Sequence, residues 1–282
     1  MLDSIAPLDA PLDAPLDAMS DSIVADRQGG VATLTLNRPA ALNALDFAMM
    51  DALVAHTSAI AIDDEVRVLV IRGAGRHFMA GGDLRTFATR LDREPDARRA
   101  EFQRTVETLH AAIEHLHRMP AIVIAQVQGA VAGFGLSLMC ACDLAVAADD
   151  AYFATAYRNI ALTPDGGGTW ALPRLVGLRK ALELLLLSER IDAKEAQRLS
   201  LVNRVVPAPE LDATVTALAA SLAAGPRLAL RNAKRLARES LDRSLSEQLQ
   251  AEAVSFAHCT ASPDFVEGIR AFLDKRPPRF ER

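Results

Sequence analysis

The feature that most constrains the fold is a change of pattern near residue 208. Before that point, short apolar segments with strand periodicity alternate with segments of helical periodicity, as in "VATLTLNRP" (31–39), "FAMMDALVAHTSAIA" (47–61) and "VRVLVIRG" (66–73). After it the strand signals vanish, and amphipathic helices are expected over roughly 209–224, 226–240, 243–258 and 263–274. The pattern predicts an α/β core followed by a helical C-terminal region.

The β–α–β alternation continues through the first part of the chain. A helix is expected around 98–118, a strand in "AIVIAQVQG" (121–129), a short buried helix in "GLSLMCACD" (135–143) and a strand in "LAVAA" (144–148). The crossovers are long enough to join parallel strands. With 282 residues, half of them hydrophobic, the chain suits one substantial domain and a smaller appendage.

The N-terminal stretch "APLDAPLDAPLDA" repeats the tetrad PLDA three times. It has no basic segment and no apolar segment, so it is not a secretory signal. Its proline and aspartate content predicts a disordered tail over residues 1–18. Met19 follows directly, and translation could start at Met1 or at Met19.

Composition excludes several classes of function. The formal net charge is −5 and no stretch is dense in Lys or Arg, so no nucleic-acid partner is expected. No apolar run reaches the roughly 18 residues of a membrane span, and "ALELLLLS" (181–188) is expected to be a core helix. Three cysteines are too few and too irregularly spaced for a disulfide scaffold or a zinc site, which predicts no metal and a cytoplasmic protein.

Three glycine-rich segments are predicted to follow strands: "FMAGGDL" (78–84), "QGAVAGFGLS" (128–137) and "PDGGGTW" (164–170). Glycine permits positive φ and lets backbone N–H groups approach a ligand closely. Each segment alone is also consistent with a simple tight turn. A nucleotide-binding loop is not indicated, because the chain has no GxxxxGK[ST] motif and no acidic residue at the required distance after "GAVAGFG".

Taken together, these segments resemble a known family. "NRPAALNAL" (37–45), "HFMAGGDL" (77–84), "QGAVAGFGLSLMCACDLAVAADDAYF" (128–153) and "PDGGGTWALPRLVG" (164–177) have the order and spacing of the crotonase, or enoyl-CoA hydratase/isomerase, superfamily. The last of them is most similar to the epoxyphenylacetyl-CoA isomerase branch. The resemblance implies a spiral of ββα turns over 19–208 and C-terminal helices over 209–282 that assemble a homotrimer or a hexamer.

The resemblance also implies a substrate, an acyl-CoA thioester of fatty-acid or aromatic-acid catabolism, with no cofactor beyond the CoA of the substrate. Two backbone N–H groups, those of Gly82 and Phe134, would stabilise the enolate oxygen. Many relatives have Gly at the position of Phe134. The residues implied to line the CoA groove are Ala44, Ala80, Gly81, Asp83 and Leu84.

The lysine that many relatives carry near Ala41, before this groove, is absent. Arg38, Arg76 and Lys275 are alternative contacts for the CoA phosphates, although each is also consistent with a solvated surface cation.

Hydratases of this superfamily use two glutamates, and the matching positions here are Ser137 and Tyr157. Neither side chain is a base near neutral pH. Efficient hydration is therefore not expected, and both residues are expected to line the acyl pocket. The resemblance instead gives Asp165 the role of acid/base, because isomerases and dehalogenases of the superfamily have an aspartate there.

Burial among Ile160, Leu162 and Trp170 is expected to raise the pKa of Asp165. Trp170 itself is expected to pack under the following helix. One alternative for Asp165 is an N-cap of that helix. Another is a 4-chlorobenzoyl-CoA dehalogenase-like hydrolase in which Asp165 attacks an aryl carbon and His110 activates water.

The favoured function is an acyl-CoA isomerase that shifts a double bond or opens a ring. A weak enoyl-CoA hydratase and a non-catalytic acyl-CoA binder also remain open.

Overall fold

The structure, a computed structural model, describes residues 21–280, so the predicted tail over 1–18 lies outside it. A six-stranded sheet in the order β1-β2-β3-β4-β6-β9 forms its centre. The β1–β2 pair is antiparallel and the other pairs are parallel. The strands are β1 (Ile23–Gln28), β2 (Val31–Leu36), β3 (Val68–Gly73), β4 (Ile122–Val127), β6 (Leu144–Ala148) and β9 (Arg204–Val206).

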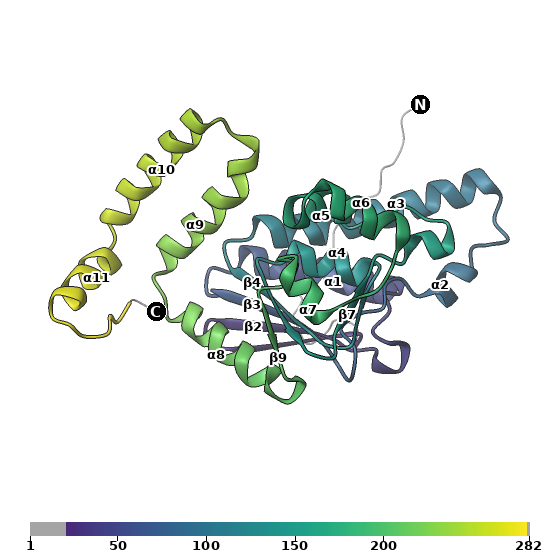
Figure 1. Ribbon diagram of the computed structural model, residues 1–282, viewed down its shortest axis with the longest axis horizontal. Helices are drawn as coiled ribbons and strands as arrows, with labels where there is room; N and C mark the ends of the chain where they lie inside the picture. The colour runs from purple at the N-terminus through teal and green to yellow at the C-terminus, as the bar shows by residue number, and fades with distance from the viewer. Residues whose placement is uncertain (1–20, 281–282) are drawn as a thin grey trace, which may run out of the picture.

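Helices cover both faces of this sheet (Figure 1). On one face, α1 (Phe47–Ile62) and α3 (Pro95–Arg118) pack over side chains such as Leu69 and Ile71. On the other, α8 (Leu211–Ala223) packs over Val68 and Val70. Because neighbouring residues of β3 face opposite layers, its "VLVI" run is continuously apolar, as expected of a parallel strand covered on both sides.

A smaller three-stranded sheet, in the order β5-β7-β8, lies beside the first and carries the short helices. Its strands are β5 (Ala130–Ala132), β7 (Tyr152–Ala154) and β8 (Ile191–Asp192). The helices of this part and of the preceding loop are α2 (Leu84–Ala88), α4 (Phe134–Ala141), α5 (Gly168–Val176), α6 (Leu178–Leu187) and α7 (Ala193–Arg198).

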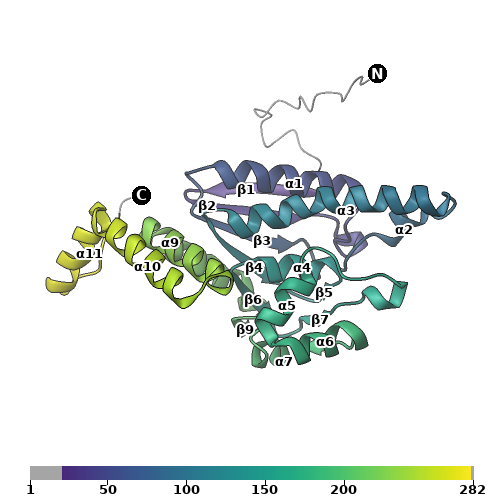
Figure 2. The same ribbon diagram turned by 90° about the horizontal axis from the view of Figure 1, so that it is seen from above.

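The last three helices project from one end of the core as an arm (Figures 1 and 2). They are α9 (Arg227–Glu239), α10 (Leu245–Thr260) and α11 (Pro263–Leu273). A capping box between Ser244 and Glu247 starts α10. Within residues 21–280 no single helix is long and apolar enough to cross a membrane, although α8 and α9 with their flanking turns pass that test jointly as a pair bent by 106°.

One expectation for the fold is wrong. The "ALELLLLS" segment was expected to be a core helix, but α6 lies on the surface and buries only Ala181 and Leu184. Leu186 is 65% exposed and Leu187 is 49% exposed. The four consecutive leucines place apolar side chains on every side of the helix, so the sequence does not show which side packs against the core.

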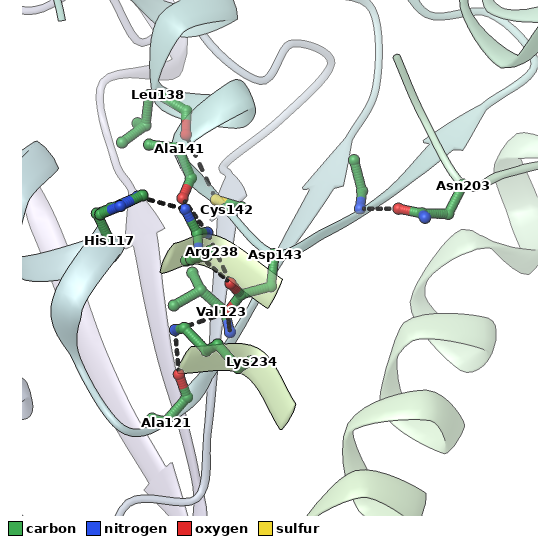
Figure 3. Close-up of polar contacts among 11 residues, drawn as sticks. His117, Ala121, Val123, Leu138, Ala141, Cys142, Asp143, Asn203, Lys234 and Arg238 are labelled. Atoms are coloured by element: carbon green, nitrogen blue, oxygen red, sulfur yellow. Dashed lines mark hydrogen bonds and ion pairs between the residues drawn. The ribbon is translucent and has the colours of Figure 1, made fainter. Parts of the chain in front are cut away.

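A buried ion cluster attaches α9 to the core, and Figure 3 shows Asp143 between Lys234 and Arg238. Asp143 Oδ2 lies 2.7 Å from Lys234 Nζ, and Asp143 Oδ1 lies 2.6 Å from Arg238 Nη2. Lys234 also donates to the carbonyl of Ala121, and Val123 N–H donates to Asp143. The side chain of Lys234 is only 6% exposed. The arm is therefore held by charges that are removed from water.

His56, on α1, predicts an acid-sensitive fold. It is 1% exposed, and within residues 21–280 neither ring nitrogen has a hydrogen-bond partner. Burial lowers its pKa, so the folded state keeps the ring neutral while the unfolded chain binds a proton below about pH 6.5. The free energy of unfolding should therefore fall as the pH drops below that value.

We expect His56→Leu to lose less stability than the wild type between pH 7 and pH 5, as measured by chemical denaturation at both values. The matched control is Met49→Leu, a buried position on the same helix that carries no titratable group. This variant should lose as much stability between pH 7 and pH 5 as the wild type. An equal loss in His56→Leu and the wild type would refute this assignment.

Candidate active site

Two glycine-rich turns meet at the junction of the two sheets. An isolated parallel bridge joins Leu45 to Gly82 and uses only the backbone groups of Leu45, whose N–H donates to Gly81 and whose carbonyl accepts from Asp83. The N–H of Gly82 is left out of the bridge. A Cβ on Gly81 would lie 3.7 Å from the nitrogen of Phe134, so the turn before α2 lies against the start of α4.

Phe134 is the first residue of α4, where a backbone N–H has no acceptor inside the helix. Across residues 21–280 neither the N–H of Gly82 nor that of Phe134 has a hydrogen-bond acceptor. The N-terminal end of α4 also carries partial positive charge. These are the properties of a pair of donors for an oxyanion. The sequence prediction named the same two residues.

The third glycine-rich segment leads into α5 and packs against α4. Gly166 and Gly167 both have positive φ, +57° and +75°. A Cβ on Gly166 would lie 2.7 Å from the ring of Phe134, and one on Gly168 would lie 2.7 Å from Ser137 Oγ. Glycine is required here for both conformation and space. The segment does not directly follow a strand as expected, because the 3₁₀ turn Tyr157–Ile160 intervenes after β7.

Asp165 lies in this turn and contacts both residues that stand at the hydratase glutamate positions. The hydroxyl of Tyr157 donates to Asp165 Oδ1 at 2.5 Å, and Ser137 Oγ donates to the main-chain oxygen of Asp165 at 2.8 Å. Ser137 is 3% exposed. The structure therefore brings Phe134, Ser137, Tyr157 and Asp165 into one cluster.

The electrostatics of this cluster favour a basic carboxylate. Burial raises the pKa of Asp165 above its ordinary value, and the hydrogen bond that Tyr157 donates only partly offsets this. Burial and the adjacent Asp165 also raise the pKa of Tyr157, which therefore stays protonated as a donor. Asp165 is thus a stronger base than an exposed aspartate.

The alternative role of Asp165 as an N-cap is excluded, because Gly167 precedes α5 and no side chain caps that helix. Ile160 and Leu162, expected beside Asp165, are themselves 41% and 49% exposed. The expectation that Trp170 packs under the helix is wrong: it is 42% exposed, the guanidinium of Arg174 lies 4.1 Å from its ring centroid, and the ring of His117 meets it edge-on.

The residues predicted to line the CoA groove lie within the Gly82 turn or next to the segment that it bridges. Ala44 precedes the Leu45–Gly82 bridge, and Ala80 N–H donates to the carbonyl of Leu42. Asp83 caps α2 through the N–H of Arg85, and Leu84 begins that helix with 51% exposure.

Arg38 does not present a free cation to a phosphate. Its guanidinium lies 2.9 Å from Asp83 and 3.1 Å from Asp46, and it also donates to the carbonyl of Ala44. Although slight burial acts to raise the pKa of Asp83, the hydrogen bonds from Arg38 and Arg85 lower it overall. Arg38 therefore ties the Ala44 segment to the N-terminal caps of α1 and α2, Asp46 and Asp83. Arg76 and Lys275 are exposed.

His110 belongs to this site, but its ring is engaged differently from the dehalogenase expectation. Its Nε2 accepts a hydrogen bond from Gly166 N–H at 3.1 Å, so that lone pair is not available to activate water. Phe87 is a further residue of the site, and the sequence did not indicate it. A Cβ on Gly82 would lie 2.7 Å from the ring of Phe87, so this ring lies directly beside Gly82.

Comparisons with known proteins identify the family of the chain. The family model described as "Enoyl-CoA hydratase/isomerase" matches residues 26–282. The chain is 38% identical to a probable enoyl-CoA hydratase of Rhodobacter capsulatus, with 89% of this chain and 94% of that protein covered. It is 35% identical to the 1,2-epoxyphenylacetyl-CoA isomerase of Escherichia coli, with 93% and 99% covered.

The crystal structure of a putative enoyl-CoA hydratase/isomerase from Mycobacterium abscessus superposes with a TM-score of 0.88 at 32% identity, covering 92% of this chain and 99% of that one. The family match, the sequence relatives and the fold all indicate the same family. The chain belongs to the enoyl-CoA hydratase/isomerase, or crotonase, family of acyl-CoA enzymes.

Proposed function

We propose that the protein is an acyl-CoA isomerase that shifts a double bond, or opens a ring, in a CoA thioester. The single observation that supports this choice is that Asp165 is the carboxylate of the cluster, while the two hydratase glutamate positions hold Ser137 and Tyr157, both hydrogen-bonded to Asp165. Hydration across a double bond calls for one base and one acid, whereas a proton shift requires one group that does both in turn.

The proposed reaction has two proton transfers at carbon. Asp165 removes a proton from the acyl chain, and the electrons move onto the thioester oxygen, where the N–H groups of Gly82 and Phe134 stabilise the negative charge. The protonated Asp165 then returns the proton to a different carbon, which displaces the double bond. In the ring-opening variant, the same enolate chemistry breaks a bond of a strained ring next to the acyl chain. No external reductant or oxidant is required.

Hydratase activity is the second candidate, and the names of relatives support it. One relative is named a probable enoyl-CoA hydratase, and a 38% identical relative from Escherichia coli is named 2,3-dehydroadipyl-CoA hydratase. Comparing wild-type rates for 3-hexenoyl-CoA isomerisation and crotonyl-CoA hydration separates the two. The proposal requires isomerisation to be the faster reaction, and faster hydration would refute it. A non-catalytic acyl-CoA binder would bind both and convert neither.

The same proposal includes the wider setting of the enzyme. It would work in the cytoplasm as a homotrimer or a hexamer, with the CoA of its substrate and no other cofactor. Sedimentation of the purified protein would distinguish the two assemblies, and a stable monomer would contradict both.

Tyr157→Phe should make the activity more acid-sensitive. The hydrogen bond from Tyr157 lowers the pKa of Asp165 against the raising effect of burial, so its loss should raise that pKa further. A carboxylate acts as a base only above its pKa, so the acid limb of kcat/KM should move to higher pH. Turnover near neutral pH should fall by up to about tenfold.

The matched control is Tyr152→Phe, the only other tyrosine of the chain, which lies in β7 under Arg190. Its pH profile should match the wild type. An acid limb in Tyr157→Phe that stays in place or moves to lower pH would contradict the proposed role of Asp165 as the base.

A further inference from the structure

Both polar groups of the peptide unit between Asp165 and Gly166, the carbonyl oxygen and the N–H, are hydrogen-bonded to side chains. Its carbonyl oxygen accepts a hydrogen bond from Ser137 Oγ at 2.8 Å, and its N–H donates to His110 Nε2 at 3.1 Å. The two side chains come from different helices, Ser137 from α4 and His110 from α3. One peptide plane is thus fixed by two elements that are separated in the sequence.

Within the turn itself this peptide unit has one further contact, because Gly168 N–H donates to the carbonyl oxygen of Asp165 at 3.1 Å. Rotation of the plane changes ψ of Asp165 and φ of Gly166, and a glycine tolerates either orientation. The next residue, Gly167, has positive φ as well, so the turn has little intrinsic preference. The Asp165 side chain leaves the Cα atom at one end of this plane, so tying the plane to α3 and α4 fixes where that Cα, and the carboxylate it carries, lies relative to those helices.

Packing limits where the plane can move but leaves its rotation open. The space beside Gly166 is filled by the ring of Phe134, and Gly166 itself is buried. Tyr157 holds one carboxylate oxygen of Asp165, yet it reaches only the end of that side chain. Apart from the hydrogen bond from Gly168 within the turn, the backbone that carries the carboxylate is therefore held by Ser137 and His110.

We propose that His110 and Ser137 are positioning residues that anchor the Asp165–Gly166 peptide plane to α3 and α4 and so hold the Asp165 carboxylate in place for the substrate. The inference rests on the proposed role of Asp165. It assigns His110 a neutral ring with the proton on Nδ1, because Nε2 is the acceptor. His110 then acts through Gly166 and does not touch the reacting atoms.

The first test separates the effect of losing the hydrogen-bond acceptor, His110 Nε2, from the effect of losing the bulk of the imidazole ring. His110→Leu removes the acceptor, whereas the side-chain oxygen of His110→Gln is able to reach the place of Nε2. We expect kcat for 3-hexenoyl-CoA to fall about ten- to one-hundredfold in His110→Leu, with KM changed by less than about threefold, and most of the loss to be recovered in His110→Gln.

His115→Leu is the matched control on the same helix. His115 is also half-buried, but its Nδ1 pairs with Thr57 Oγ1 on α1, away from the turn. This variant should keep the wild-type kcat. Equal losses in His110→Leu and His110→Gln, or in His110→Leu and His115→Leu, would overturn the proposal.

A second test uses the two ends of the plane together. Because Ser137 and His110 restrain the same rotation, adding Ser137→Ala to His110→Leu should cost less in kcat than the product of the two separate losses. Multiplication of the losses would show that the residues act independently and would contradict a shared plane.

A third test does not depend on activity. Nitrogen NMR of the histidine rings in the wild-type protein, with the His110 signals assigned by their absence from His110→Gln, should show a neutral His110 ring protonated at Nδ1. Protonation at Nε2 would overturn the positioning role even if Asp165 is catalytic. Conversely, high turnover in Asp165→Asn would remove the proposed function while leaving this ring state in place.

Discussion

Replacing Asp165 with asparagine is expected to lower turnover of 3-hexenoyl-CoA by about 10²- to 10⁴-fold, the usual contribution of a positioned acid/base. Asparagine has nearly the same shape, and its carbonyl oxygen still accepts the hydrogen bond that Tyr157 donates to Oδ1. It has no carboxylate to take the proton. The turn should therefore keep its geometry while the chemistry stops.

Two controls make this result specific. Binding of a non-reactive acyl-CoA, measured by calorimetry, should be unchanged, because the oxyanion donors at Gly82 and Phe134 are backbone groups. Asp51→Asn, an exposed acid on α1, should turn over like the wild type. If Asp165→Asn retained near-wild-type turnover, another group would have to move the proton.

The largest effect on stability is expected at Asp143. Asp143→Ala should lower the free energy of unfolding by about 3–5 kcal/mol, the cost of breaking a buried ion pair by removing one partner. The change leaves Lys234 and Arg238 unpaired with side chains 6% and 19% exposed. Burial already lowers the pKa of Lys234, and Asp143 is the main group that acts against this. Equilibrium denaturation measures the difference.

The matched control is Asp64→Asn, which breaks the exposed pair with Arg227, where the side chains are 81% and 37% exposed. Such a pair contributes about 0–1 kcal/mol. Adding Lys234→Met to Asp143→Ala should recover part of the loss, because it removes an unpaired buried charge. If Asp143→Ala and Asp64→Asn had similar effects, the buried cluster would not anchor the arm.

Most of the fold could be predicted from the sequence because the core elements have strong periodicity. The alternating residues of β2 indicate a strand with one buried face and one less buried face. The continuous apolar run of β3 indicates a strand that is covered by helices on both faces. The helical C-terminal region was expected from residue 209 and is observed. The leucines of α6 misled because composition does not specify which side of a helix meets the core.

The sequence indicated which residues lie together in the cluster but not how they contact one another. Matching motifs pointed to Gly82, Phe134, Ser137, Tyr157 and Asp165, and within residues 21–280 the N–H groups of Gly82 and Phe134 have no acceptor. The hydrogen bond from Gly166 to His110 joins residues 56 positions apart, and no local pattern encodes such a pairing. Phe87 was missed for the same reason, because its contact with Gly82 depends on the path of the loop into α2.

The absence of the two glutamates explains the setting of Asp165. A serine and a tyrosine at those positions supply hydrogen bonds where hydratases would have carboxylates, so no second acid competes for the proton within the cluster. Burial then keeps the single carboxylate basic. The arrangement is suited to a reaction that uses one base twice.

Incorporation of deuterium tests most directly whether Asp165 moves the proton. Wild-type protein and Asp165→Asn would be incubated with 3-hexenoyl-CoA in deuterated water, and the recovered thioesters analysed by mass spectrometry. The wild type should yield isomerised product carrying deuterium, because the protonated carboxylate exchanges with solvent before it returns the proton, whereas Asp165→Asn should yield unlabelled substrate. Equal labelling by the two proteins would contradict the assignment of Asp165 as the acid/base.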